Sequence, residues 1–285
     1  MASGSRIGWA LATAVGISAG LAGYVLHAAL TKRHPQIVEV RRWTNMGSAQ
    51  SPAISPDGKT LAFVAPVNGR SQIWVADKAI TQDDEDHFGP RWSADSASLI
   101  FFASNAVWEI PDQGGAAQPL AESIAPGDLS HTGKHLAYAR SEALLADEQI
   151  IAKLPAGRYS NLRWSPDDKK IAYLKDSADI WVASTSGGDP KVAFHSVVPL
   201  DGFAWLPDGS GLIVSSSMNS VETQRSNYNL WVVPRDNSAL KQLTFGELSY
   251  ESPDTSAAGD VFVRRVAMPP DGHSDIIELS GMKFR

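Results

Sequence analysis

The sequence predicts an all-β fold, a six-bladed β-propeller with four-stranded blades. Three observations predict it. A tight turn followed by short β-rich runs recurs six times after residue 35. The turns lie on average about 40 residues apart, close to the 40–45-residue period of propeller blades. Seven of the nine Trp residues fall at two positions of this repeat.

The clearest repeat unit begins with the turn Ser55-Pro56-Asp57-Gly58-Lys59. Proline presets φ for a turn, the aspartate side chain bonds back to its own backbone, and glycine supplies a positive φ. The short apolar runs 61–64 and 72–76 follow and predict two strands. The unit therefore predicts a turn, a strand, a loop and another strand.

The other five copies follow the same order with more variation. Their turns begin at Ser93, Ser130, Ser165, Leu206 and Ser256. The paired strand predictions are 99–102 with 107–110, 136–139 with 149–152, 171–174 with 179–182, 212–214 with 229–232, and 261–263 with 275–279. In the third copy this assignment leaves Glu142–Gln149 as a loop.

The tryptophans mark two recurring positions. Trp92, Trp164 and Trp205 precede a turn, and Trp74, Trp108, Trp181 and Trp231 lie in the later strand. A large ring that recurs at one register predicts a recurring packing slot between neighbouring sheets. We therefore expect core residues at these positions rather than ligand platforms.

The last copy lacks a fourth strand, and a matching segment lies at the start of the repeat region. Arg42-Trp43-Thr44 aligns with Gln242-Leu243-Thr244 of the fifth copy. We expect residues 37–45 to form the outer strand of the blade built by residues 256–283. Such a join removes a free sheet edge and closes the ring.

The segment before the repeats predicts a membrane anchor. Residues 1–6 form a short tail, residues 7–30 carry no formal charge, and residues 31–36 form a linker to the propeller, 37–285. A helix of 24 residues would be about 36 Å long, enough to span a ~30 Å hydrocarbon core with tilt. A cleaved signal peptide, with a site at Gly20-Leu21-Ala22, is the alternative, and would leave a soluble periplasmic protein. The flanking charges do not decide the orientation.

Small residues lie along one face of this apolar segment. Gly16 and Gly20 fit the G-x-x-x-G pattern, and Gly23 extends the small face, so helix packing in the bilayer is one interpretation. An anchor without a specific partner is the other. The same segment matches G-x-S-x-G, but a serine inside an apolar helix lacks the strand–turn–helix setting of a hydrolase.

Charge and composition exclude several classes of function. The net charge is -6, with the basic excess confined to the first 35 residues, so nothing indicates the basic patch that nucleic-acid binding needs. The chain has no Cys, which excludes disulfides, a zinc–cysteine site and a cysteine nucleophile.

Two clusters are candidate metal sites. The acidic run 83–87 could bind Ca²⁺, but its spacing is not that of an EF-hand, and a solvated loop is the interpretation we favour. His131 and His135 are four residues apart, yet they flank a predicted turn and strand rather than sharing a helix face. We therefore predict no cofactor, with Ca²⁺ as the alternative.

The fifth copy carries a long polar insertion, residues 215–227, between two strands. Surplus loops often carry binding function. We expect this loop and the Glu142–Gln149 loop to form a partner-facing rim, against the alternative of a plain surface loop. The candidate contact residues are Met218, Asn219, Glu222, Gln224 and Arg225.

The repeat unit, Ser-Pro-Asp-Gly-Lys followed by Leu-Ala-Phe and then Ile-Trp-Val, resembles that of the TolB-type propellers across residues 37–285. The sequence lacks the α/β domain that precedes the TolB propeller and the hydrolase domain of peptidases with similar repeats. The resemblance implies the fold and a periplasmic location at a bacterial inner membrane. We expect a single-pass, non-catalytic scaffold or accessory subunit with membrane or envelope protein partners. A sensor for a glycan or peptide is the alternative, and an enzyme that uses channel residues is a third.

Overall fold

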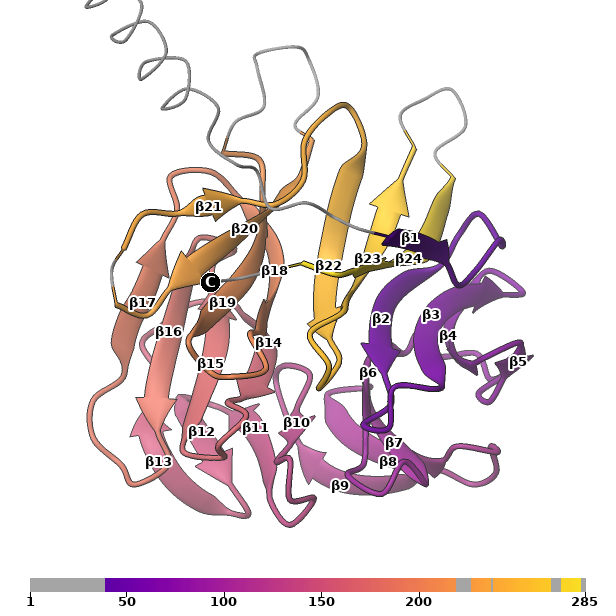
Figure 1. Ribbon diagram of the computed structural model, residues 1–285. Coiled ribbons are helices and arrows are strands. Elements are labelled where there is room, and N and C mark those ends of the chain that lie inside the picture. Colours follow the sequence, from indigo (N-terminus) through magenta and orange to yellow (C-terminus); the bar gives the residue numbers. More distant parts are fainter. Residues whose placement is uncertain (1–38, 219–226, 237, 268–272, 283–285) are drawn as a thin grey trace, which may run out of the picture. The chain divides into compact units, whose positions relative to one another are not determined.

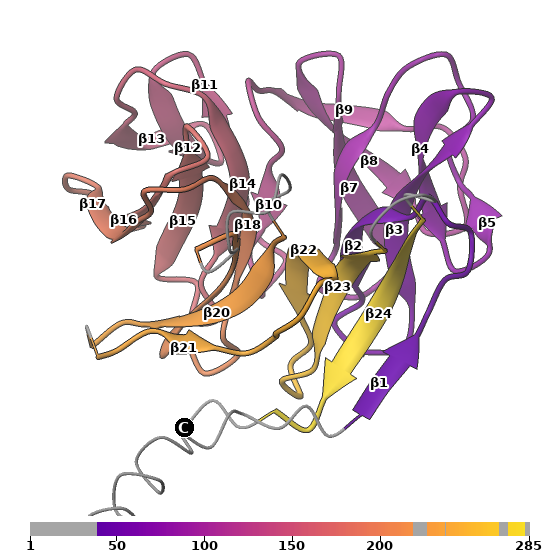
Figure 2. The same cartoon turned by 90° about the horizontal axis from the view of Figure 1, so that it is seen from above.

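The computed structural model describes residues 39–218, 227–236, 238–267 and 273–282. These residues form 24 β-strands and no helix. The strands group into six four-stranded antiparallel sheets, which confirms the predicted propeller. The sheets follow one another around a ring in chain order, from indigo to yellow (Figures 1 and 2).

Each sheet is one blade, numbered here in ring order from the innermost strand outward. Blade 1 is β2 (Gln50–Ile54), β3 (Leu61–Val67), β4 (Arg70–Val75) and β5 (Lys78–Ala79). Blade 2 is β6 (Phe88–Trp92), β7 (Ser98–Ala103), β8 (Ala106–Pro111) and β9 (Gln118–Glu122). Blade 3 is β10 (Asp128–Leu129), β11 (Leu136–Arg140), β12 (Ala143–Ala146) and β13 (Gln149–Lys153).

The second half of the ring has the same order, except for its last strand. Blade 4 is β14 (Tyr159–Trp164), β15 (Lys170–Lys175), β16 (Asp179–Ser184) and β17 (Lys191–His195). Blade 5 is β18 (Leu200–Trp205), β19 (Gly211–Ser216), β20 (Asn229–Pro234) and β21 (Lys241–Gln242). Blade 6 is β22 (Ser249–Thr255), β23 (Val261–Val266), β24 (Ser274–Ser280) and β1 (Glu39–Arg42).

The ring closes through β1, as predicted. This strand pairs antiparallel with β24, with Val40 opposite Leu279 (Figure 2). Beyond the strand, the Thr44 hydroxyl accepts a 2.9 Å hydrogen bond from the N–H of Ile276. The outer segments of two other blades repeat this contact: Thr81 accepts from Ile73, and Thr244 accepts from Leu230, each at 2.9 Å. Thr44 therefore takes the place of Thr244, as the sequence alignment predicts.

The turns after the innermost strands are closed by serine and aspartate side chains. In blade 1 the Ser55 hydroxyl donates to Asp57 at 2.6 Å and accepts from the N–H of Thr60 at 2.9 Å. Gly58 takes a φ of 73° at the end of the turn. Blades 2 and 4 repeat the contacts with Ser93 and Ser165, because the same residue types recur at the same spacing.

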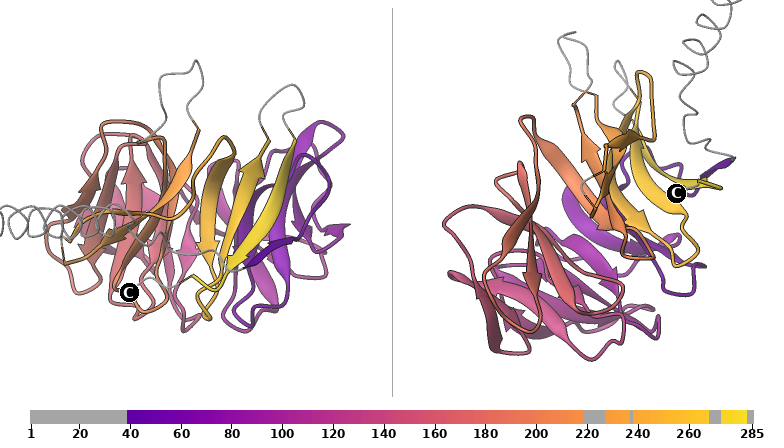
Figure 3. Two further views of the ribbon diagram at one scale, coloured as in Figure 1. Left: turned by 45° about the horizontal axis from the view of Figure 1, so that its top comes forward. Right: turned by 60° about the vertical axis from the view of Figure 1, so that its left-hand side comes forward.

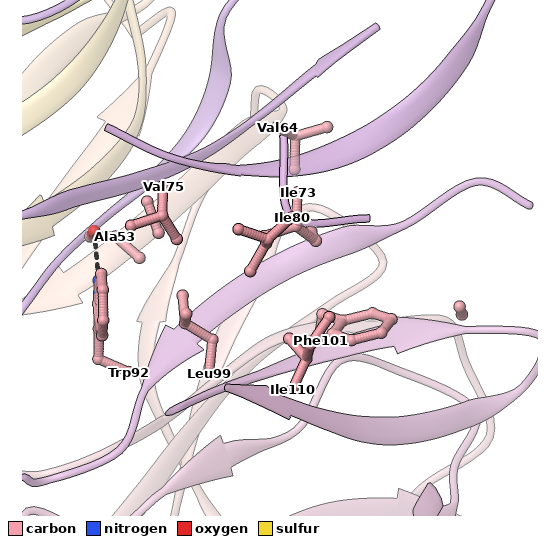
Figure 4. Packing of buried hydrophobic residues seen from close by; sticks show 11 residues of the cluster. Ala53, Val64, Ile73, Val75, Ile80, Trp92, Leu99, Phe101 and Ile110 are labelled. Atoms are coloured by element: carbon pink, nitrogen blue, oxygen red, sulfur yellow. Dashed lines mark hydrogen bonds between the residues drawn. The ribbon is translucent and has the colours of Figure 1, made fainter. Parts of the chain in front are cut away.

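The tryptophans that precede these turns join neighbouring blades. Each indole donates to a backbone carbonyl of the preceding blade: Trp92 to Ala53 at 3.0 Å, Trp164 to Asp128 at 3.1 Å, and Trp205 to Arg163 at 3.2 Å. Figure 4 shows the first of these bonds beside the apolar cluster between blades 1 and 2. These rings are core residues, as predicted, and each also supplies a hydrogen bond between blades.

The third blade corrects one prediction. The segment Glu142–Gln149 is not a loop, because Ala143–Ala146 forms β12, which pairs with β11 and with β13. The run 149–152 is therefore the fourth strand, not the third. Ala-Leu-Leu-Ala lacks the tryptophan and β-branched residues that mark this strand in other blades, and its burial against neighbouring blades decides its conformation instead.

The predicted anchor, 7–30, lies outside the described residues. Among the residues that the structure describes, no helix is long and apolar enough to cross a membrane.

Candidate functional site: the central channel

The six innermost strands surround a channel. Each contacts the innermost strand of the next blade, from β2 through β6, β10, β14 and β18 to β22, and β22 contacts β2. At the end of the channel next to the serine turns lies a cavity of about 370 Å³, lined by residues from all six of these strands and the turns after them. We call this cavity the channel mouth; it is the place where all six blades contribute to one surface.

One position of the repeat supplies four charged side chains to the channel mouth. It lies two residues before the first residue of each turn, and its occupants line the cavity. We call these six residues the channel ring; in ring order they are Ala53, Arg91, Asp128, Arg163, Ala204 and Asp254. The ring thus holds two cations and two anions, and the two alanines leave space beside them.

The backbone positions these side chains with a bulge. In five blades the pairing of the innermost strand with its neighbour shifts register just before or beside the channel-ring residue. In four of these the residue two positions before the ring residue has a positive φ: Ser51, Gly89, Asn161 and Ser252. A bulge re-aims the side chains that follow it, so the repeated bulge places the same position of each blade at the channel.

Asp128 is a buried carboxylate held between two blades. Its Oδ2 accepts a 2.8 Å hydrogen bond from the N–H of Trp164, and its Oδ1 lies 4.0 Å from Nε of Arg91. Burial raises the pKa of the Asp128 carboxyl to about 6, although the Arg91 charge and the Trp164 N–H lower it. The carboxylate is therefore costly to keep ionised in this channel.

Asp254, in blade 6, repeats this arrangement with the blade that follows it. Its Oδ2 accepts a 2.9 Å hydrogen bond from the N–H of Ile54 in the next blade. Burial raises the pKa of Asp254, and the Arg91 charge acts in the opposite direction. His131, at the rim of the mouth, also interacts electrostatically with both aspartates.

The two arginines keep hydrogen-bonding capacity. Nη1 of Arg91 donates to the carbonyl of Pro90, and Nη1 of Arg163 donates to that of Leu162, each at 2.7 Å. The Nε atoms of both arginines are buried without a hydrogen-bond partner among the described residues. A buried donor without a partner costs free energy, so a ligand that satisfies it gains affinity.

Of the residues proposed from sequence for a partner-facing rim, the structure describes only Met218. Met218 is half-buried and packs against the apolar cluster between blades 4 and 5. Asn219, Glu222, Gln224 and Arg225 lie outside the described residues, as do Gly16, Gly20 and Gly23. The Glu142–Gln149 segment is a strand and its following turn, so the prediction of a loop there is wrong.

The two metal candidates are engaged within the protein. His131 contacts Asp168 at 3.3 Å, whereas His135 contacts Asp147 at 2.5 Å, so the histidines share no partner. Asp83 binds His87 at 3.0 Å. Glu85 accepts from Ser104 and Asp86 accepts from the N–H of Ser71, both at 2.8 Å. In the described ranges of the chain, no three His, Asp or Glu residues form a group that could hold a metal ion.

Comparison with solved structures supports the TolB-type fold. A protein described as TolB from Agrobacterium tumefaciens matches with a TM-score of 0.55 and 20% identity, over 71% of this chain and 83% of that one. TolB from Acinetobacter baumannii matches with a TM-score of 0.51 and 15% identity, over 83% of this chain and 64% of that one. An oligogalacturonate lyase in complex with manganese matches with a TM-score of 0.54 and 10% identity, over 86% of this chain and 93% of that one.

These similarities show the fold alone. It is shared by TolB proteins and by a lyase, so it is compatible with a binding protein and with an enzyme. No protein-family model matches the chain, and no curated protein matches it.

The sequence analysis missed the channel ring. A signal was present, because the position is fixed by its distance from each turn. Its occupants, however, are Ala, Arg or Asp, which carry no shared pattern. Only closure of the ring brings residues 35 to 50 positions apart together.

Proposed function

We propose that this chain is a non-catalytic protein-interaction module that binds a segment of a partner protein at the channel mouth. The observation that carries the proposal is the channel ring, with two arginines and two carboxylates of raised pKa in one cavity. The TolB-like fold supports a protein-interaction role.

The charges of the ring define the partner's chemistry. A carboxylate or carbonyl oxygen of the partner would be attracted by the guanidinium groups of Arg91 and Arg163, which line the mouth. An N–H or ammonium group would compensate Asp254 or Asp128. Because the ring is balanced in charge, it favours a polar segment with both donors and acceptors over a simple ion. Peptide backbone and side chains together offer that combination.

Site-specific photo-crosslinking tests the proposal. A photoreactive residue at Ala257, an exposed residue of the mouth, should trap the partner in living cells. Arg163→Glu should abolish the crosslink, because it reverses one charge of the ring. Arg158→Glu is the matched control, since Arg158 is exposed and is not among the residues of the channel mouth. An undiminished crosslink in Arg163→Glu would contradict binding at the channel.

A sensor for a glycan or peptide is the second candidate, favoured by the size of the mouth, which falls within the 300–1,000 Å³ typical of small-molecule pockets. A free ligand should raise the melting temperature of the isolated chain, and a tethered partner should not be needed. A lyase-type activity is the third, because an oligogalacturonate lyase shares the fold. Product formation from oligogalacturonate, lost in Asp128→Asn, would support it.

The proposed site of action is a bacterial inner membrane, with residues 7–30 as a single-pass anchor and the propeller in the periplasm. The length of the uncharged segment supports the anchor. Tethering would raise the local concentration of the propeller near a membrane complex and so relax the affinity that the channel must supply. Digestion of the propeller in spheroplasts by added protease is the expected result; protection would place it in the cytoplasm.

A further inference from the structure

A second cavity lies between blades 4 and 5, distinct from the channel mouth. It has a volume of about 580 Å³. We call it the inter-blade groove. Part of its wall is apolar and comes from the third strand of blade 4 and the inner three strands of blade 5, through Val182, Trp205, Leu212 and Val233. The hairpin that joins β16 to β17 and the start of β17 form the rest of one side.

The matching space between blades 1 and 2 is filled. There Val75, Trp92, Leu99 and Ile110 occupy the positions of the four apolar groove residues and pack with Ile80 (Figure 4). The loop after β8 covers this interface, because Lys78 donates to the carbonyl of Gln113 at 2.7 Å. A Cβ at Gly114 would lie 3.4 Å from the carbonyl oxygen of Ile80. The groove between blades 4 and 5 is therefore not repeated between blades 1 and 2. Figure 3 shows the blades from two further directions.

The polar part of the groove is strongly biased in charge. Lys170, Lys191 and Arg235 line it, against the single carboxylate of Asp189. Among the described residues, neither lysine has an ion-pair partner, and the guanidinium group of Arg235 donates only to the carbonyl of Gly209, at 3.0 Å. This local excess of two positive charges contrasts with the net charge of -6 of the whole chain.

We propose that the inter-blade groove binds a small amphipathic anion, a compact aromatic or short aliphatic body that carries one carboxylate. The apolar wall would take the body, and the lysines would take the anionic head. The volume lies within the range of small-molecule sites, which are mostly apolar with a few polar groups that fix orientation. The lysine ammonium groups act as point charges, which suits a ligand with one anionic head. A peptide would instead need hydrogen-bond donors and acceptors along its length.

Trp205 connects this groove to the channel. This residue lines both cavities, and its indole donates to the carbonyl of Arg163 in the channel ring. A ligand in the groove would therefore contact the same tryptophan that borders one edge of the channel mouth. The groove does not depend on the proposed channel function, because its residues and its ligand are different.

Three probes with one shared body test the charge preference. They are 2-naphthoate, 2-naphthylmethanol and 2-naphthylmethylammonium, titrated by calorimetry into the full chain in buffer free of detergent micelles. Naphthoate should bind at least about tenfold more tightly than the ammonium probe, a difference of about 1.4 kcal/mol, because the local excess of positive charge attracts a carboxylate and repels an ammonium. Equal binding of the three probes, or no binding of naphthoate, would overturn the proposal.

Two variants locate the binding. Lys170→Glu/Lys191→Glu should weaken naphthoate binding at least about tenfold, since it reverses both free charges. Ala193→Trp should abolish binding of all three probes, because Ala193 is an exposed residue of the groove wall and a large ring there fills the space. Lys134→Glu is the matched control; Lys134 is exposed and lies outside the groove. An unchanged melting temperature shows that each variant folds, and unchanged naphthoate binding in the first two would refute the site.

Discussion

The N–H of Trp164 donates a 2.8 Å hydrogen bond to the carboxylate of Asp128, and the indole of the same tryptophan donates to the Asp128 carbonyl at 3.1 Å. One residue of blade 4 thus donates hydrogen bonds to both the side chain and the backbone of one residue of blade 3. This double contact links one of the tryptophans that join neighbouring blades to the channel ring.

The first prediction concerns the pH dependence of stability. The pKa of Asp128 is raised from an ordinary 3.8 to about 6, so the folded state binds more protons than the unfolded state between these values. The contribution of Asp128 to stability therefore falls as pH rises from about 4 to 6. Asp128→Asn should remove this dependence and raise the unfolding free energy at pH 7 by up to about 3 kcal/mol.

Urea denaturation at pH 4.5 and pH 7 measures both quantities. Asp57→Asn is the opposite control: the pKa of Asp57 is lowered by its hydrogen bond from Ser55, so its ionised form contributes stability above its unfolded pKa. That variant should lose stability at pH 7. A stability difference between Asp128→Asn and wild type that does not grow in favour of the variant from pH 4.5 to 7 would contradict the first prediction.

The second prediction concerns the bonds between blades. Trp164→Phe keeps an aromatic ring but leaves the Asp128 carbonyl without its donor, so it should cost about 1 kcal/mol beyond the lost packing. Trp181→Phe is the matched control, because its buried indole nitrogen has no hydrogen-bond partner among the described residues. Thermal or urea unfolding compares the two. Equal losses would show that the hydrogen bond contributes nothing.

The third prediction concerns ring closure. Thr44→Val should leave the N–H of Ile276 buried and unpaired, at a cost of about 1–3 kcal/mol. Thr44→Ser retains the hydroxyl and should recover most of the loss. Thr81→Val, which breaks the same contact inside blade 1, should cost a similar amount. If Thr44→Val matched wild type in chemical denaturation, the closing contact would be dispensable.

The fourth prediction concerns the bulge of blade 2. Gly89 has a φ of 57°, and a Cβ there would lie 3.0 Å from Cβ of Pro126. Gly58 has a φ of 73° with no atom within 4 Å of the same position. Both Gly→Ala changes should cost about 1–2 kcal/mol for the left-handed conformation, and Gly89→Ala should cost more because of the contact. Equal losses of unfolding free energy in the two variants would show that the contact with Pro126 is relieved at no cost.

The sequence was sufficient for most of the fold because its signals are local. Ser55, Pro56, Asp57 and Gly58 specify a turn within a few residues, and the short apolar runs that follow specify the strands beside it. Closure by residues 37–45 was also predictable, since Thr44 repeats the pattern of Thr244. The error at Glu142–Gln149 has the same origin: β12 lacks a local signal, and contacts with neighbouring blades form it.

The sequence by itself determined the repeat, the number of blades and the strand that closes the ring. Tertiary structure alone decided which charges meet. Arg91, Asp128, Arg163 and Asp254 are ordinary residues on four separate strands. The raised pKa values of the two aspartates and the buried Nε donors of the two arginines arise only when the ring closes around them. The inter-blade groove likewise depends on what fills the space between two blades, because packing against a neighbour is not a property of either blade alone.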